Sequence, residues 1–310
     1  MKCFYHNDLD GRCAGAIVAR YVNSYNSNYF YEVDYNTGIP IDTVNNGEIV
    51  FIVDLSFTEK TVEQLYSLLD KDCDVRWVDH HKSSLDLLRN VEYYHLNNVK
   101  GIRSDEYSGA ALTWMYLYDK PYYEIPYVVK LVSDYDCWKY QFDPDTTHFK
   151  LGIELTDYDA LSSVWRELFD DNKITISVQY GPGERDSTYT LDKIISDGNV
   201  VKKYVDNELA IYRKSYAYET EIDGHKAVAV NRRSNSWIFG ELYDIYPICI
   251  PYVHNGEKWE FSLFSNANKF PDIDCSKIAK KYGGGGHAHA AGACVVDLPF
   301  KKIGEVKYAK

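Results

Sequence analysis

Three strand-like stretches within the first 81 residues each run into aspartate or histidine. They are KCFYH (2–6), EIVFIVDLS (48–56) and DVRWVDHH (74–81), with helix-like segments between them. The middle stretch is almost continuously apolar, as expected of a strand that a parallel sheet buries on both faces. The alternation of strands and helices predicts an α/β fold with a parallel sheet and helices on both of its faces.

The apolar spacing of the other segments indicates where helices lie. Apolar side chains three and four residues apart share one face of a helix, and a Ser or Thr just before such a segment is a typical cap. The expected helical segments are 13–22, one that follows Thr58, 107–135 with Ser108 as its cap, 157–170, and 191–217 after the turn-rich GPGERD (181–186).

A chain of 310 residues is long enough for about two domains. We expect a metal-binding domain over residues 1–149, a helical connector over 150–219 and a smaller α/β domain over 220–310. In the last part we expect strands at 225–231, 246–253 and 258–265, then a helix over 274–282 that ends at the glycines 283–286.

Charge and cysteine content exclude several classes of protein. The net charge of −12 argues against a binder of long duplex nucleic acid, which needs Lys and Arg to neutralise many phosphates. Seven cysteines without a C-x-x-C pair argue against a disulfide framework and a cysteine-type zinc site. No apolar run reaches the ~20 residues that span a bilayer, and the N-terminus lacks the apolar stretch of a signal peptide. We therefore expect a cytoplasmic protein without a membrane partner.

Aspartate and histidine gather at the expected carboxyl ends of the three strands. His6, Asp8 and Asp10 alternate along the chain, so an extended backbone would turn all three side chains the same way. Ligands of parallel α/β sheets collect at this edge, and mixed oxygen and imidazole donors favour Mn²⁺. Each motif alone is more often a turn, a cap or a surface carboxylate. Their coincidence at one sheet edge predicts a site for two metal ions.

Five motifs occur along the chain: HNDLDG (6–11), VDLS (53–56), VDHH (78–81), SDYD (133–136) and GGGGHAHAAG (283–292). Their order resembles the DHH phosphoesterase superfamily with its DHHA1 C-terminal domain. Among the branches of that family, the form of the first and fourth motifs looks most like the nanoRNases, which degrade short oligoribonucleotides.

The resemblance implies a role for each matching position. His6 and Asp8 would hold the first metal ion, Asp10 the second, and Asp54 would bridge the two. His80 and Asp134 would complete the set of ligands around the second ion, with Asp136 as the alternative to Asp134. His81 would face the scissile phosphate and Asp79 would orient the histidines. The cofactors implied are two divalent ions, Mn²⁺ foremost, with Mg²⁺ or Co²⁺ as alternatives.

The glycine-rich motif is expected to bind substrate rather than to form a flexible linker. Glycines before a helix let backbone N–H groups approach a phosphate, so Gly284, Gly285 and Gly286 are candidates, and the family implies that His287 contacts the substrate. The pair His287 and His289 as a third metal site is the weaker interpretation.

One position departs from the family. Its members often carry Ser-x-Arg-Ser before the glycines, whereas residues 262–265 here read SLFS. Arg232 or Arg233 could take the place of the missing arginine, or Phe264 could stack on a base.

The leading hypothesis is therefore a phosphodiesterase that hydrolyses short oligoribonucleotides to mononucleotides with water activated by two metal ions. The alternatives are a hydrolase of cyclic dinucleotides, of their linear products or of 3′-phosphoadenosine 5′-phosphate, and an inactive scaffold. The expected partner is a short RNA or small nucleotide, and a homodimer is one candidate for the oligomeric state.

Overall fold

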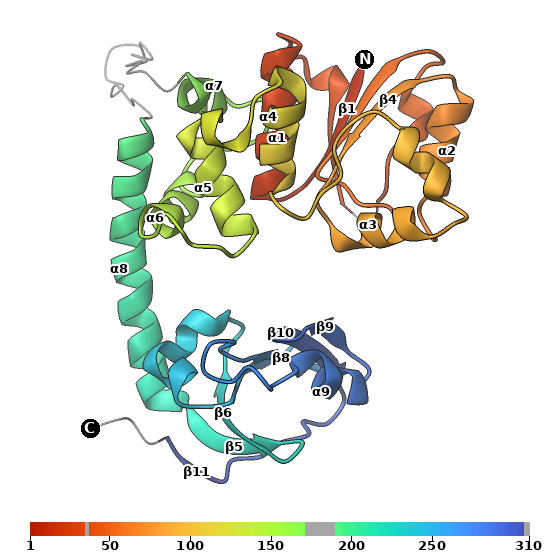
Figure 1. The fold of residues 1–310 in the computed structure, drawn as a ribbon. Helices are drawn as coiled ribbons and strands as arrows, with labels where there is room; N and C mark the ends of the chain where they lie inside the picture. The colour runs from red at the N-terminus through yellow and green to blue at the C-terminus, as the bar shows by residue number, and fades with distance from the viewer. Residues whose placement is uncertain (35–36, 171–189, 307–310) are drawn as a thin grey trace. The chain divides into compact units, whose positions relative to one another are not determined.

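The computed structural model describes residues 1–34, 37–170 and 190–306. The predicted turn at 181–186 lies outside these residues. The chain divides into two compact units, residues 1–202 and 203–310, and the boundary falls within the long helix α8 (Leu191–Tyr216). Each unit has its own sheet (Figure 1), and apolar cores pack on both faces of each sheet.

The first unit is built on a four-stranded parallel sheet of order β2-β1-β3-β4. The predicted parallel sheet is confirmed, and the short edge strand β2 adds to it. Because all four strands run the same way, their carboxyl ends meet at one edge. The strands are β1 (Lys2–His6), β2 (Phe30–Val33), β3 (Ile49–Val53) and β4 (Asp74–Val78).

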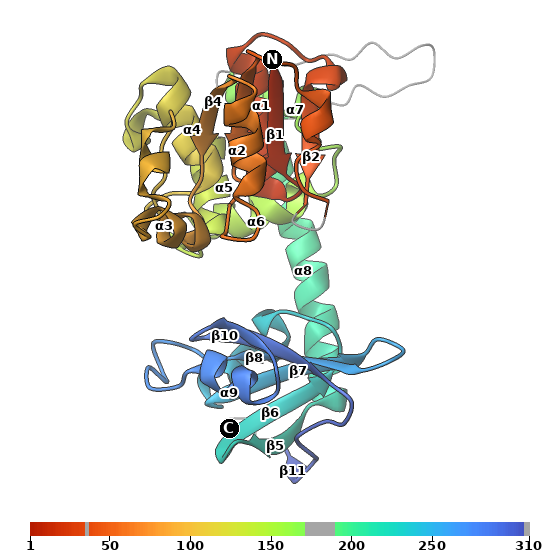
Figure 2. The same ribbon diagram turned by 90° about the vertical axis from the view of Figure 1, so that its right-hand side faces the viewer.

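Helices cover both faces of this sheet (Figures 1 and 2). Successive strand side chains point to opposite faces, so Tyr5 packs in the core beneath α1, α4 and α5, while Phe4 packs in the core beneath α2 and α3. The helices are α1 (Leu9–Tyr21), α2 (Glu63–Asp70), α3 (Lys82–Arg89), α4 (Gly109–Tyr118), α5 (Tyr127–Asp136), α6 (Asp145–Ile153) and α7 (Ser163–Phe169).

Several expected helices have different bounds in the structure. The segment 107–135 is not one helix: α4 ends at Asp119 in the left-handed conformation (φ +51°), and α5 starts only after Pro126. Ser108 does cap α4, accepting a hydrogen bond from the N–H of Ala111. Thr58 forms a turn with Val62 instead of capping α2 directly. Helix α1 begins at Leu9, so the expected extended backbone through Asp10 is wrong.

The second unit contains a mixed seven-stranded sheet of order β11-β5-β6-β7-β8-β10-β9. Helix α9 packs on one face of it, and η5 with the C-terminal half of α8 packs on the other. The elements are β5 (Tyr218–Ile222), β6 (His225–Asn231), β7 (Ile248–His254), β8 (Trp259–Phe264), α9 (Cys275–Lys281), β9 (Gly285–His287), β10 (Ala290–Val295) and β11 (Gly304–Glu305).

Short 3₁₀ turns complete the chain: η1 (Ser27–Tyr29), η2 (Ile41–Thr43), η3 (Tyr94–Asn98), η4 (Tyr122–Glu124) and η5 (Ser236–Asp244). Within the described ranges, none of the helices is both long and apolar enough to cross a membrane.

Candidate metal centre

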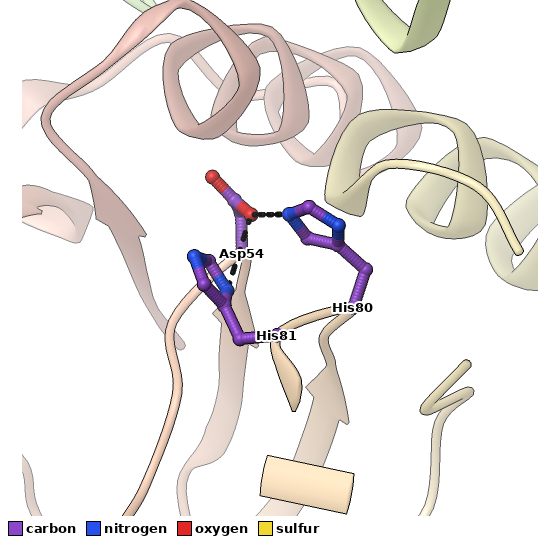
Figure 3. A group of neighbouring side chains, drawn as sticks. All are labelled: Asp54, His80 and His81. Atoms are coloured by element: carbon purple, nitrogen blue, oxygen red, sulfur yellow. Dashed lines mark ion pairs between the residues drawn. The ribbon is translucent and has the colours of Figure 1, made fainter. Parts of the chain in front are cut away.

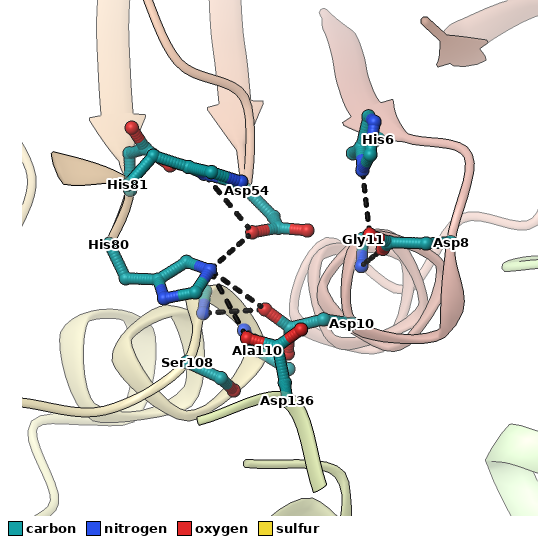
Figure 4. A network of polar contacts seen from close by, with 12 residues as sticks. His6, Asp8, Asp10, Gly11, Asp54, His80, His81, Ser108, Ala110 and Asp136 are labelled. Atoms are coloured by element: carbon teal, nitrogen blue, oxygen red, sulfur yellow. Dashed lines mark hydrogen bonds and ion pairs between the residues drawn. The ribbon is translucent and has the colours of Figure 1, made fainter. Parts of the chain in front are cut away.

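The carboxyl ends of three neighbouring strands bring the candidate ligands together. His6 is the last residue of β1, Asp54 follows β3, and Asp79 follows β4 with His80 and His81 behind it. Figure 4 shows His6, Asp54, His80 and His81 converging with Asp8, Asp10 and Asp136, which come from the helix ends beside the sheet. The convergence predicted from the three strand ends is present in the structure.

Asp54 takes an uncommon backbone conformation at the end of β3. Its φ of +54° lies in the left-handed region, which aspartate tolerates better than most residues, and its N–H donates to Val78 O at 2.9 Å. Gly109, at the start of α4, lies so close that a Cβ there would be 2.6 Å from the Asp54 carboxylate. The sheet edge and α4 therefore enclose Asp54, whose side chain is only 1% exposed.

The imidazole of His80 faces three carboxylates at once. Its Nε2 lies 3.3 Å from Asp54 Oδ1, 3.3 Å from Asp136 Oδ2 and 3.8 Å from Asp10 Oδ2. Figure 3 shows Asp54 reaching toward both His80 and His81, and the Nδ1 atom of His81 is 3.8 Å from Asp54 Oδ1. These side chains come from the ends of β3 and β4 and from α1 and α5, so only the folded chain brings them together.

The electrostatics of this group are dominated by burial. Burial, reinforced by the charge of Asp10, raises the pKa of Asp54 and of Asp136. For His80 burial acts in the opposite direction, but its contacts with Asp54, Cys137 and Asp10 outweigh burial and raise its pKa. The protein thus compensates closely packed negative charge by holding protons at this group.

His6 and Asp8 form a second group of candidate ligands, next to the group around His80. Asp8 caps α1, its Oδ1 accepting the N–H of Gly11 at 2.9 Å, while its Oδ2 lies 2.8 Å from His6 Nδ1. Burial tends to raise the pKa of Asp8, but the bonds from His6 and Gly11 lower it overall. One ligand atom each from His6, Asp8 and Asp54 lie within 4.8 Å of one another.

Asp79 holds the ring of His81. Its side chain is fully buried, and its Oδ1 lies 2.8 Å from His81 Nδ1. A carboxylate in this position fixes the orientation of the imidazole. His81 itself is 30% exposed, so its ring is fixed on one side and open to solvent on another.

The donor set fits divalent cations. Among the described residues, no donor reaches the buried oxygens Asp54 Oδ1 and Asp136 Oδ2 in hydrogen-bond geometry, although both lie close to His80. Buried carboxylates without hydrogen-bond donors are costly unless a cation neutralises them. Oxygen and imidazole donors are the usual ligands of Mn²⁺ and similar ions, and Asp54 belongs to both the His6 group and the His80 group.

Asp136, and not Asp134, faces the candidate centre. Asp134 is buried, and its two oxygens accept hydrogen bonds from the N–H groups of Gln141 and Phe142 and from the hydroxyl of Thr146. It therefore holds the loop after α5 in place. Asp136, the alternative considered from the sequence, points to His80 (Figure 4).

The glycine-rich segment of the second unit forms a hairpin, contrary to the helix expected after it. Gly285–His287 is strand β9, which pairs antiparallel with β10. Gly286 has φ +136°, and a Cβ there would meet Ala290 O at 2.6 Å. Gly284 and Gly286 are therefore required for close strand pairing. The expectation that these glycines begin a phosphate-binding helix is wrong.

Small residues line one face of this hairpin. Phe264, Ala290 and His287 are directly paired across β8, β10 and β9, so their side chains share one face of the sheet. Gly285 and Gly292 continue that face without side chains. The side chain of His287 is exposed, whereas the ring of Phe264 is half-buried and packs partly against the core beneath η5 and α8.

Arg232 and Arg233 do not lie beside the hairpin. They follow Asn231 of β6, which pairs with Tyr252 of β7, and three strand spacings separate β6 from β10. Tyr252 pairs with Phe261 of β8, and Phe261 pairs with Ala293 of β10. The turn between β9 and β10 precedes Ala290, so it lies several residues along the strand from this row of pairs. Strand spacing and rise put Arg232 roughly 20 Å from that turn. Its guanidinium lies over the ring of Tyr212 instead, 4.9 Å from the centroid.

Comparison with known proteins supports the family expected from the motifs. No protein-family model matches the sequence. Oligoribonuclease NrnB of Bacillus subtilis is 26% identical over 335 aligned residues, covering 96% of this chain and 73% of NrnB. An uncharacterized protein of Acanthamoeba polyphaga mimivirus is 26% identical over 240 residues, covering 73% of this chain. The aligned part spans half the length of that viral protein.

Solved structures share the fold at low sequence identity. The DHH domain of a protein described as belonging to a family of ribosomal proteins superposes with a TM-score of 0.57 at 12% identity, covering 94% of this chain and 82% of that one. The pGpG-specific phosphodiesterase PggH from Vibrio cholerae gives a TM-score of 0.50 at 13% identity, covering 95% and 92%. In its five ordered motifs, in the fold that it shares with a DHH domain and in its 26% identity to NrnB, this chain is similar to the DHH/DHHA1 phosphoesterase superfamily and, within it, to the nanoRNase branch.

Proposed function

We propose that this chain is a metal-dependent phosphodiesterase that hydrolyses short oligoribonucleotides to mononucleotides. The observation that carries the proposal is the convergence of three carboxylates on His80 Nε2, at distances of 3.3, 3.3 and 3.8 Å. These closely packed carboxylates need cations to neutralise their charge, and a pair of divalent ions suits the hydrolysis of a phosphodiester. The name of the relative NrnB points to the same class of substrate.

The proposed ligands divide into two sets that share Asp54. His6 and Asp8 hold the first ion, and Asp10, His80 and Asp136 hold the second. Mn²⁺ is the ion that the mixed oxygen and imidazole donors favour, ahead of Mg²⁺. When bound, two such ions supply a water molecule of lowered pKa and offset the negative charge of the phosphoryl group.

The protein residues position the substrate and stabilise charge. Asp79 orients His81, whose partly exposed ring faces an oxygen of the scissile phosphate. The second unit contributes its own nucleotide contact at His287, which shares a sheet face with Phe264. An aromatic ring can stack on a base without regard to sequence, and the ring of Phe264 is half-buried.

The test is hydrolysis of an RNA dinucleotide, a long RNA and a cyclic dinucleotide side by side with Mn²⁺. We expect rapid loss of the dinucleotide alone. Asp54→Asn should abolish that activity, because the carboxamide keeps the shape and the left-handed backbone preference but removes the bridging charge. Asp86→Asn, on the exposed face of α3, is the matched control and should stay active.

The alternatives give distinct results. Linear pGpG is itself a dinucleotide. If the protein cleaved pGpG and no other dinucleotide, its activity would be the one named for PggH. Cleavage of the cyclic dinucleotide alone would replace the oligoribonuclease proposal by one in nucleotide signalling. Metal binding without cleavage of any of these substrates would favour the inactive scaffold over an enzyme.

A further inference from the structure

A sulfur atom lies within the same cluster, beyond the ligands assigned above. Cys137 is the C-cap of α5, and its N–H donates to Ser133 O at 3.0 Å. One ligand atom each from His80, Asp136 and Cys137 lie within 4.8 Å of one another. The helix end fixes the backbone of Cys137 next to His80 and Asp136.

The other cysteines have different surroundings. All seven lie in the described part of the chain, and Cys137 is the only one in a group of potential metal ligands there. It is half-buried, whereas Cys294 is exposed and the rest are buried: Cys3, Cys13, Cys73, Cys249 and Cys275. Cys137 is thus accessible to a bound ion in a way that the structural thiols are not.

A buried carboxylate provides the second, independent observation. The side chain of Asp54 is 1% exposed, its Oδ1 meets no donor in hydrogen-bond geometry within the described residues, and that atom points at His80 Nε2 from 3.3 Å. Metal–ligand bonds of about 2.0–2.3 Å in a tetrahedral shell place donor atoms roughly 3.3–3.8 Å apart. The spacing between the carboxylates and His80 therefore fits donors around one ion.

We propose that the Cys137 thiol is a ligand of this centre beside His80 and Asp136, and that it gives the centre a preference for thiophilic divalent ions over Mg²⁺. Sulfur donors favour Zn²⁺ and related ions, whereas Mg²⁺ prefers oxygen. Binding replaces the S–H bond by a metal–sulfur bond, and the thiol proton passes to solvent. A single thiol in a mixed set differs from the C-x-x-C zinc site that the sequence excludes. The inference rests on the proposed metal centre and deepens it.

The test is titration of the full-length, metal-free protein with Co²⁺ under reducing conditions, without substrate. A cobalt–thiolate bond produces a sulfur-to-metal charge-transfer band in the near ultraviolet, separate from the visible bands that report bound cobalt. We expect the charge-transfer band in the native protein and in the control Cys294→Ser. Cys137→Ser should lose this band while it keeps the visible bands, and its Cd²⁺ affinity should fall at least about tenfold with Mn²⁺ affinity much less affected.

Two results would overturn the inference: native protein that binds Co²⁺ without the charge-transfer band, or a band of full strength in Cys137→Ser. Should Cys137→Ser fail to fold, X-ray absorption at the cadmium edge of the native protein decides, because a sulfur neighbour is either present or absent. The readout needs no turnover. Hydrolysis without the band would refute the thiol ligand alone, and the band without hydrolysis would refute the proposed function alone.

Discussion

Asp10 and Gly109 are 99 positions apart in the chain, and the N–H of Gly109 donates to Asp10 Oδ2 at 2.7 Å. The N–H of Ala110 donates to Asp10 Oδ1 at 3.1 Å. A carboxylate in the first turn of α1 thus caps α4, where an anion is favoured by the helix dipole. Because the same carboxylate lies 3.8 Å from His80 Nε2, Asp10 contributes both to the fold and to the candidate metal centre.

Substitution of Asp10 should therefore destabilise the protein even without metal. We expect Asp10→Asn to lower the free energy of unfolding by about 1–2 kcal/mol, since the helix end loses its anion. Asp10→Ala should cost more, because two buried N–H groups lose their acceptor at about 1–3 kcal/mol each. Urea unfolding in excess chelator measures both. The exposed variant Asp86→Asn is the control, and an unchanged stability of Asp10→Ala would contradict the capping role.

Asp134 and Asp136 should respond differently to the same change. Asp136→Asn should weaken binding of the second ion and reduce activity with little loss of stability, because this carboxylate faces His80. Asp134→Asn should destabilise the fold, since Asp134 accepts two hydrogen bonds from the loop after α5 and one from Thr146 of α6. Metal content after dialysis and thermal unfolding of both variants, compared with native protein, separate the two effects. Normal metal content in Asp136→Asn, with loss of metal in stable Asp134→Asn, would reverse the assignment.

Metal binding should release protons near neutral pH. Burial and the charge of Asp10 raise the pKa of Asp54 and Asp136, and the contacts of His80 with Asp54 and Cys137 raise its pKa despite burial. Raised pKa values mean that the metal-free protein holds protons that a metal ion must displace. The apparent affinity for Mn²⁺ should therefore increase as the pH rises.

Calorimetric titration with Mn²⁺ in buffers of different ionisation enthalpy gives the number of protons released. We expect a positive number for native protein and a smaller one for Asp136→Asn. The exposed variant Asp86→Asn should match native protein. Binding that is independent of pH and of the buffer would show that the cluster is already deprotonated.

The central strands were predictable because their apolar runs are long and end in distinctive residues. Buried strands such as Ile49–Val53 need apolar side chains on both faces, a pattern that sets them apart from the amphipathic helices around them. The edge strand Phe30–Val33 has only its two end residues buried, so it carries a weaker signal. Pro121 and Pro126 indicate the break between α4 and α5, because proline interrupts a helix. The apolar spacing of 107–135 nevertheless led us to expect one continuous helix.

The candidate site could be located from sequence, but its members could not all be chosen. Three strand ends at one sheet edge indicated His6, Asp54 and His80 because parallel strands end together. Asp134 and Asp136 are two residues apart, so they project from opposite sides of the last turn of α5. Which of them faces the centre depends on how α5 packs, and that is a property of the tertiary structure. Cys137 had only its position next to Asp136 as a signal.

Substrate contacts in the second unit provide a final prediction. Phe264 and His287 flank Ala290 on one sheet face, whereas Arg232 lies over Tyr212 at the other end of the sheet. Phe264→Ala should therefore raise KM for an RNA dinucleotide by an amount equivalent to about 1–3 kcal/mol, the usual contribution of one stacked base. His287→Ala should also raise KM, while metal content stays unchanged because neither residue belongs to the metal cluster.

Arg232→Ala is the informative comparison for these two variants, because arginine was the alternative suggested by the sequence. We expect its KM to match that of native protein. Phe264→Tyr, which keeps an aromatic ring, should restore most of the affinity lost in Phe264→Ala if the ring stacks on a base. A KM that rises as much in Arg232→Ala as in Phe264→Ala, or a Phe264→Ala variant with native KM, would show that the open face of the hairpin does not bind the nucleotide.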